Sequence, residues 1–141
     1  MKQEQKELLL KDLCSRLPYK VKVGTTDNDG SLENVWDTLW YNTFTEDVKL
    51  THSTEDADKI VDISEVKPYL FPLSSMTEEQ KQYLKNRFYY DWDGEPYDLW
   101  KCQIEIGEVD GLIDWFHENH IDYRSLIPMG LANDATGKNI Y

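Results

Sequence analysis

Two histidines in the C-terminal third of the chain are the first residues whose type and spacing could do chemistry. His117 and His120 lie three residues apart, and Asp110 and Asp114 precede them within two helical turns. Imidazole and carboxylate groups at such spacing can bind a metal or act as an acid–base pair. At about 100° per residue, however, His120 falls within an apolar arc typical of a hydrogen-bonded core histidine, whereas His117 falls on the polar flank beside the aspartates. The spacing alone therefore does not predict a metal site.

The cysteines, Cys14 and Cys102, could act as nucleophiles or metal ligands, but neither belongs to a C-x-x-C pair. A closed zinc site needs a full tetrahedral set of ligands, usually from paired Cys and His motifs. Cys14 lies among leucines with helical spacing, so we expect it to be buried as a small apolar residue. The sequence predicts no metal and no other cofactor.

Motifs that accompany catalysis are absent from the sequence. There is no G-x-S-x-G elbow, no G-x-x-x-x-G-K phosphate loop and no G-x-G-x-x-G fingerprint. Carboxylate pairs such as Asp91 and Asp93 could do glycosidase-type acid–base work, but such pairs are unavoidable where acids are this dense. We therefore predict that the chain is not an enzyme.

An acidic turn near the N-terminus is similar in composition to a calcium-binding loop. Asp27, Asp29 and Gly30 would stand at loop positions three, five and six, but Thr25 and Trp36 would then stand at positions one and twelve. A calcium loop needs oxygen ligands there, including a bidentate Glu at the last position. We interpret the segment as a hairpin turn.

The segment 89–100 is the most unusual, because five aromatic residues alternate with four acids. Tyr and Trp side chains of this kind anchor protein interfaces, since they bury a large amphipathic area at low entropic cost. They also stack on sugars, and the alternative is that some of them close the core beneath a loop. The predicted partner-contact residues are Trp92, Trp100, Tyr97, Tyr90, Asp91, Asp93, Glu95 and Asp98.

The charge of the chain is strongly acidic and unevenly placed. Fifteen Lys and Arg oppose 27 Asp and Glu, for a formal net charge of −12, and the segment 91–122 holds ten acids against one base. Such a field repels the phosphates of nucleic acids and anionic membranes, and it can steer a basic protein partner. The alternative is a solvated acidic face without a partner.

The elements that must position these residues can be predicted from periodicity. Leucines at helical spacing predict a helix over 2–16, which Pro18 ends. Alternating runs then predict a sheet over 19–63, with strands at 19–23, 35–44, 48–52 and 59–63. These short strands should form one small antiparallel sheet that curls like a barrel.

The second half of the chain is predicted to be mostly helical. Pro68 and Pro72 lack donors, so the segment 64–76 is expected to cross over the sheet rather than to form a central strand. Thr77 and Gln80 form a capping box that begins a helix with Tyr83 on its apolar face, and a further helix is expected over 108–119. The helical part is thus 77–127, in which Asp122 should cap the next turn, followed by an irregular tail over 128–141.

The whole chain, 1–141, fits a single domain, since its length allows one core of ordinary size. The expected fold class is α+β, with a small antiparallel, barrel-like sheet packed by an N-terminal helix and two C-terminal helices. No apolar run approaches the roughly 20 residues that span a bilayer, and the N-terminus has no signal-type stretch. We therefore expect a cytoplasmic protein that does not bind a membrane.

Three blocks of the chain resemble an uncharacterised family of small proteins from the genomes, prophages and mobile elements of gut Bacteroidales. The blocks are 8–23, 66–79 and 119–132, which contain LLLKDLCSRLPY, VKPYLFPLSSMTEE and NHIDYR with LIPMGLA. Ser125 stands where the family pattern has a glycine. The resemblance implies an intracellular bacterial or phage accessory protein, and it implies no activity and no catalytic residues.

These observations lead to one predicted function and two alternatives. The expected function is non-catalytic binding of a protein partner, which the negative charge suggests is basic, without direct binding of nucleic acid. The first alternative is an acidic DNA mimic or inhibitor that occupies a nucleic-acid-binding site. A small enzyme or sugar binder is the more distant alternative.

Overall fold

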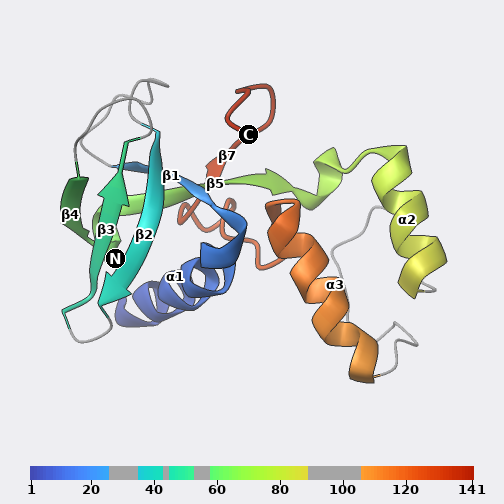
Figure 1. The fold of residues 1–141 in the computed structure, drawn as a ribbon, viewed down its shortest axis with the longest axis horizontal. Helices are drawn as coiled ribbons and strands as arrows, with labels where there is room; N and C mark the ends of the chain where they lie inside the picture. Colours follow the sequence, from blue (N-terminus) through green and yellow to red (C-terminus); the bar gives the residue numbers. More distant parts are fainter. Residues whose placement is uncertain (26–34, 43–44, 53–57, 89–105) are drawn as a thin grey trace.

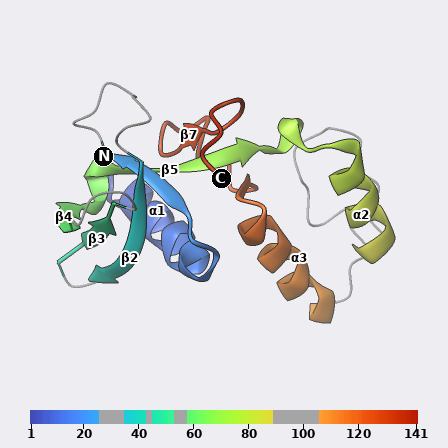
Figure 2. The same ribbon diagram turned by 45° about the horizontal axis from the view of Figure 1, so that its top comes forward.

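A computed structural model describes residues 1–25, 35–42, 45–52, 58–88 and 106–141 (Figure 1). The fold class is α+β, as predicted: an N-terminal helix packs against a curled, mostly antiparallel sheet, and two further helices lie toward the other end of the molecule (Figures 1 and 2). The predicted hairpin turn with Asp27, Asp29 and Gly30 lies outside the described residues.

Helix α1 (Gln3–Arg16) confirms the predicted N-terminal helix, and it ends where Pro18 enters the 3₁₀ turn η1 (Leu17–Tyr19). Its buried face differs from the expected one. Leu9 and Leu13 are buried, but so are the charged Asp12 and Arg16, whereas Cys14 is exposed. The prediction of a buried Cys14 is wrong because the ion pair, one turn apart, occupies the inner face that we assigned to apolar residues.

The sheet has the strand order β4-β3-β2-β1-β5-β6, and β7 also pairs with β5. All pairs from β4 to β5 are antiparallel, whereas β6 and β7 lie parallel to β5. The strands are β1 (Lys22–Thr25), β2 (Trp36–Asn42), β3 (Asp47–Thr51), β4 (Asp58–Asp62), β5 (Val66–Pro72), β6 (Ile121–Asp122) and β7 (Asn133–Asp134). The four predicted strands are confirmed within a few residues at their ends.

Strands β1 to β5 curl into a half-barrel, as one contact across it shows. Lys59 on β4 places its Nζ 3.4 Å from Thr25 Oγ1 on β1 and 5.5 Å from the centre of the Trp36 ring on β2. Strands β3 and β2 lie between β4 and β1 in the sheet. A lysine can reach so far only because the sheet bends toward its inner face, which α1 covers.

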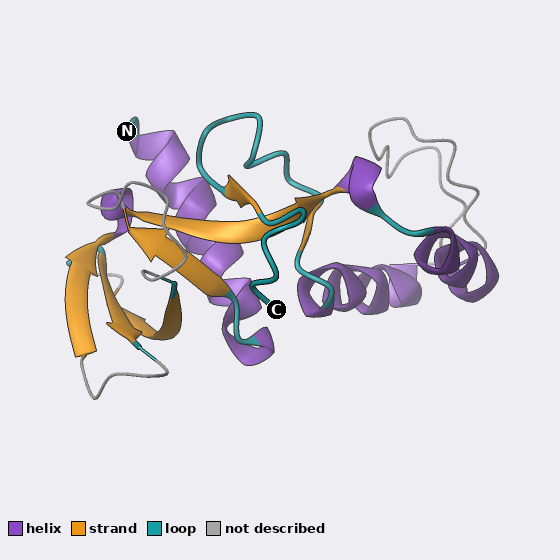
Figure 3. Ribbon diagram, turned by 90° about the horizontal axis from the view of Figure 1, so that it is seen from above, coloured by secondary structure: helices purple, strands orange, loops and turns teal. Residues whose placement is uncertain are grey.

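Strand β5 corrects the predicted crossover. The segment with Pro68 and Pro72 is a central strand that runs from the half-barrel toward α2 (Figure 3). Pro68 pairs with Val23 on one side, and on the other side pairing begins only at Tyr69. The nitrogen of Pro68 can therefore face an unpaired flank, and Pro72 ends the strand, so neither missing donor breaks the ladder.

Helices α2 (Glu78–Phe88) and α3 (Ile106–Glu118) confirm the two later helices. The capping box is present: Thr77 N donates to Gln80 Oε1 at 2.9 Å, and Gln80 N donates to Thr77 Oγ1 at 3.2 Å. Tyr83 is 48% exposed rather than buried with its helix's apolar face. It stacks on Trp115 of α3 instead, at 5.8 Å between ring centroids.

Buried side chains form two clusters. The half-barrel core lies between α1 and the sheet and contains Leu9, Leu13, Val21, Val23, Val48, Leu50, Ile63, Val66, Leu70, Leu126, Leu131 and Ala132. The helical core lies between α2, α3 and β6 and contains Met76, Leu84, Phe88, Leu112, Phe116 and Ile121. None of the described helices is long and apolar enough to cross a membrane.

The tail beyond residue 127 is mostly irregular, as predicted, but it is fastened to the sheet. Its short strand β7 pairs with β5, and the hydroxyl of Tyr141 donates to Tyr69 O at 2.7 Å and accepts from Lys22 N at 3.1 Å. The tail therefore belongs to the packed structure.

Candidate functional site

The predicted partner-contact residues lie in a part of the chain that the structure does not describe. They are Tyr90, Asp91, Trp92, Asp93, Glu95, Tyr97, Asp98 and Trp100, all within 89–105. Two other places among the described residues bring functional groups together: a buried polar network beside α1 and an exposed face of the half-barrel.

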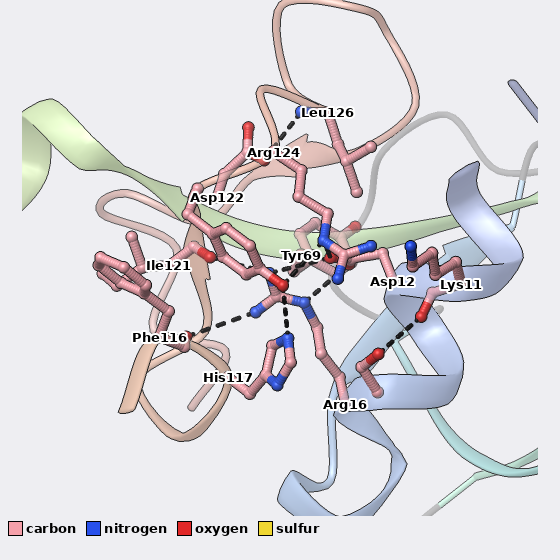
Figure 4. A network of polar contacts seen from close by, with 12 residues as sticks. Lys11, Asp12, Arg16, Tyr69, Phe116, His117, Ile121, Asp122, Arg124 and Leu126 are labelled. Carbon is pink, nitrogen blue, oxygen red and sulfur yellow. Dashed lines mark hydrogen bonds and ion pairs between the residues drawn. The ribbon is translucent and has the colours of Figure 1, made fainter. Parts of the chain in front are cut away.

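The buried network centres on Arg16, which is fully buried with Asp12 (Figure 4). Arg16 Nε lies 2.7 Å from Asp12 Oδ2, and Nη2 lies 3.2 Å from Oδ1, a bidentate ion pair within one turn of α1. The guanidinium also donates to Ile121 O at 2.8 Å and to Phe116 O at 3.5 Å. Because the last carbonyls of a helix lack partners within it, Arg16 satisfies the end of α3 from a different element.

His117 corrects the sequence prediction. It is buried, with 3% of its surface exposed, rather than lying on a polar flank beside Asp110 and Asp114. Its Nε2 lies 2.9 Å from the hydroxyl of Tyr123, whose ring stacks on Phe116. Burial, and then the positive charge of Arg16, lower the pKa of His117 to about 4.

Arg124 extends the network to a second cation. Its Nε donates to the Tyr123 hydroxyl at 2.8 Å and lies 3.5 Å from Asp12 Oδ1. The Tyr123 hydroxyl therefore bonds to both Arg124 and His117 Nε2. With a pKa of about 4, His117 is neutral at physiological pH.

Asp122 extends the network to the next turn, as predicted. Its two carboxylate oxygens accept from Leu126 N and Ile127 N, each at 2.8 Å, and burial raises the pKa of this carboxyl. Tyr123 packs against the helical core, whereas Leu126 belongs to the half-barrel core. The turn therefore connects both cores.

His120 is buried as predicted, in a left-handed conformation that ends α3 (φ 54°). Its ring stacks on Tyr141 at 3.7 Å between centroids, and burial lowers its pKa to about 4. Its Nδ1 has no hydrogen-bond partner among the described residues, which differs from the expected hydrogen-bonded histidine. Like His117, it is therefore neutral at physiological pH.

These contacts give the network a structural role. The donors of Arg16 and Arg124 described above point at protein oxygens, and the imidazole of His117 is hydrogen-bonded to the hydroxyl of Tyr123. A catalytic base must reach a proton of the substrate, whereas His117 is buried and its Nε2 is already hydrogen-bonded to Tyr123. Nor do the described residues contain a group of three or more His, Cys, Asp and Glu side chains that could hold a metal ion.

The exposed place is the outer sheet face, the side of β2, β3 and β4 that faces away from α1. Strand register aligns Trp40 with Lys49 and Lys49 with Ile60, so these three side chains form one row across the sheet. Trp40 is 40% exposed and Ile60 is 60% exposed. The register places Asp37, Asn42, Asp47, Thr51 and Asp58 on the same face, and Asp62 at its end, where its carboxylate also reaches Lys6 of α1.

Ion pairs organise the acids of the outer sheet face. Lys49 Nζ lies 2.8 Å from Asp58 and lowers the pKa of that carboxyl, and Lys22 Nζ lies 2.7 Å from Asp37. Hydrogen bonds from Ser64 lower the pKa of Asp62, which also lies 3.4 Å from Lys6 Nζ. Both β4 acids are therefore ionised at neutral pH. The sequence indicated this face only through the alternation of Asp58, Ile60 and Asp62.

Comparisons with family models, with curated proteins and with solved structures find no match to this chain.

Proposed function

We propose that the chain is a non-catalytic protein-binding domain whose contact surface includes the outer sheet face around Trp40 and Ile60. The observation that carries this proposal is the cross-strand row in which two large apolar side chains stay exposed beside ionised acids. Trp anchors contribute much of the energy of protein interfaces, and charged rims set association rates. With a net charge of −12, the partner should be basic.

The wider assignment follows the sequence. An intracellular bacterial or phage accessory protein would act in this way, and the segment 89–100, with Trp92 and Trp100, would provide a second part of the contact surface. The buried network supports a binding protein over an enzyme, because its titratable groups hold the fold together.

A DNA mimic is the weaker candidate. Such a protein presents acids spaced like phosphates, whereas Lys49, Lys22 and Lys6 pair with the acids on and beside the outer sheet face. These pairs interrupt the negative row, so the described part of the surface favours a partner that also buries Trp40 and Ile60.

The test is quantitative capture of partners from a bacterial lysate, followed by affinity measurement with the purified partner. Trp40→Ser should weaken binding about 30-fold, the effect of an interface anchor. Met129→Ser is the control, because Met129 is similarly exposed, at 43%, but lies in the C-terminal tail. Both variants should keep the wild-type melting temperature within a few degrees. Equal capture by wild type and Trp40→Ser would overturn the proposal.

A further inference from the structure

Among the strands that the structure describes, β4 is the last on its side of the sheet, and its backbone can be oriented from one hydrogen bond. Ile63 N donates to Glu46 O at 2.9 Å, just beyond the pair formed by Asp47 and Asp62. Antiparallel strands alternate between hydrogen-bonded and non-hydrogen-bonded pairs. The backbone N–H and C=O groups of Asp58, Ile60 and Asp62 therefore point away from β3, toward the edge.

The side chains of Asp58 and Ile60 lie on the outer sheet face, and that of Asp62 lies at the end of this face, 3.4 Å from Lys6 Nζ of α1. Asp58 and Asp62 keep 47% and 38% of their side chains exposed in spite of their ion pairs, and Ile60 between them is 60% exposed. A carboxylate has acceptor sites for more than one cation, so Lys49 and Lys6 leave room for a second partner. The edge thus presents the order acid, apolar, acid at every second residue, beside outward-facing backbone groups.

We propose that β4 accepts an extended segment of a basic partner protein as an added strand, with an apolar residue beside Ile60 and Lys or Arg beside Asp58 and Asp62. The inference rests on the proposed protein-binding function and names the class of partner: a segment with the pattern basic-x-apolar-x-basic. Main-chain hydrogen bonds would supply affinity, and the alternate side chains would supply specificity.

A second copy of this chain is a poor occupant of the same edge. If two β4 strands paired antiparallel about Ile60, Asp58 of each copy would face Asp62 of the other, and like charges directly opposite destabilise a pair. Lys59 also points inward, toward Thr25 and Trp36. Acids on the outside and an inward lysine are devices by which edge strands avoid self-association. Charge therefore disfavours pairing of β4 with a second β4 and favours pairing with a basic strand.

The experiment uses the full chain and a capped peptide of about nine residues, the length of a strand, with the core Lys-Thr-Ile-Thr-Lys. At about 1 mM peptide, NMR should show slower hydrogen exchange at the amides of Asp58, Ile60 and Asp62. A peptide with Glu in place of Lys, and a peptide N-methylated at its central residues, should each bind at least fivefold more weakly. Equal binding of all three peptides, or no slowing of exchange at these amides, would overturn the proposal.

Variants of the edge give a second readout. Ile60→Pro removes an outward donor that β3 does not use, so the protein should stay folded and lose binding of the peptide at least tenfold. The matched variant Ile60→Thr keeps the donor and should lose less. Asp58→Asn with Asp62→Asn should weaken binding about three- to tenfold and abolish its salt dependence.

The two proposals can fail separately. If Trp40→Ser abolishes capture of a natural partner whereas Ile60→Pro leaves it intact, strand addition at β4 is wrong and the protein-binding function stands. If the peptide adds to β4 but Trp40→Ser captures every lysate protein as wild type does, the edge proposal stands and the Trp40 surface is wrong.

Discussion

The half-barrel and the helical pair bury different kinds of side chain. The buried members of the half-barrel core are all Leu, Val, Ile or Ala, contributed by α1, the strands and the following turns, and among the described residues only Trp36 and Tyr41 add partly buried rings at its margin. The helical core contains Phe88 and Phe116, with Phe71, Trp115 and Tyr123 packed against it. A curled sheet supplies many positions for small branched residues, whereas two short helices supply few, so large rings must bury the area. The curled sheet and the helix pair thus bury their apolar surface with different types of side chain.

Polar contacts join the two regions. The side chain of Arg16 extends from α1, which packs on the half-barrel sheet, and its guanidinium donates to the carbonyls of Phe116 and Ile121 beside the helical core. Charged groups withdrawn from water are costly unless every charge is paired and every donor is used. This connection between the two regions, made by Asp12 and Arg16, therefore tolerates little change. Either core, in contrast, can repack around a small apolar substitution.

The largest expected effect on stability comes from breaking the buried ion pair between Asp12 and Arg16. Asp12→Ala leaves the guanidinium of Arg16 buried without its carboxylate, and it should lower the free energy of unfolding by about 3–5 kcal/mol. Urea unfolding followed by circular dichroism measures the loss. The control is the double variant Asp12→Leu with Arg16→Met, which removes both charges and should recover part of the stability. A double variant less stable than Asp12→Ala would show that the charges themselves are not the cost.

The contribution of large rings to the stability of the helical core can be tested at Tyr123. Tyr123→Ala removes a ring stacked 5.3 Å from Phe116 and should cost about 3 kcal/mol. Tyr123→Phe keeps the stack but loses the hydroxyl that bonds to His117 and Arg124, which should cost about 1 kcal/mol. Equal losses from the two variants in urea unfolding would mean that the hydroxyl, and not the ring, holds this region.

The two buried histidines, His117 and His120, should both contribute to the pH dependence of stability, and His117 can be tested by itself. The pKa of His117 is about 4 in the folded protein, below the ordinary histidine value, so the unfolded chain binds more protons below about pH 6.5. Stability from this group is complete above pH 6.5 and is lost as pH falls toward 4, by about 2 kcal/mol at most at pH 5. His117→Gln offers the Tyr123 hydroxyl a hydrogen-bonding partner that does not titrate, and the unfolding free energy of this variant should fall less between pH 7 and pH 5. Parallel profiles for wild type and variant would contradict this assignment.

The smallest of these effects is expected at Asp122, whose carboxylate caps the turn between the cores. Asp122→Ala should cost about 1–2 kcal/mol, the loss of a helix-type cap, and thus less than Tyr123→Ala. Asp122→Asn keeps one acceptor oxygen and should fall between wild type and Asp122→Ala. The reverse order of Asp122→Ala and Tyr123→Ala in urea would contradict the structural role of the ring.

The elements that follow from local pattern were predictable, and those that depend on distant partners were not. Alternation predicted β2, β3 and β4, and the Thr77 and Gln80 capping box predicted α2. The pair Asp12 and Arg16, one helical turn apart, has the spacing of an ordinary surface ion pair, and only Phe116 and Ile121, about a hundred residues away, explain its burial.

The exposed row of the outer sheet face was not predicted, for the same reason. Local composition singled out 89–100, whereas the exposed row of the outer sheet face depends on the register of three strands and cannot be seen within one of them. His117 was placed on a polar flank because its partner, Tyr123, lies beyond the end of its helix. Periodicity describes a face, and only tertiary contacts decide what covers it.

The position of β5 has a consequence for the order in which the protein folds. Val23 of β1 pairs with Pro68, and Tyr69 of β5 pairs with Asn133, so ladders on both flanks join segments more than forty residues apart. Closing such long loops costs conformational entropy before the contacts that offset this cost can form. Folding is therefore slow. The local meander β2-β3-β4 can form early. We expect the rate-limiting step to be the insertion of β5 between the two halves of the chain.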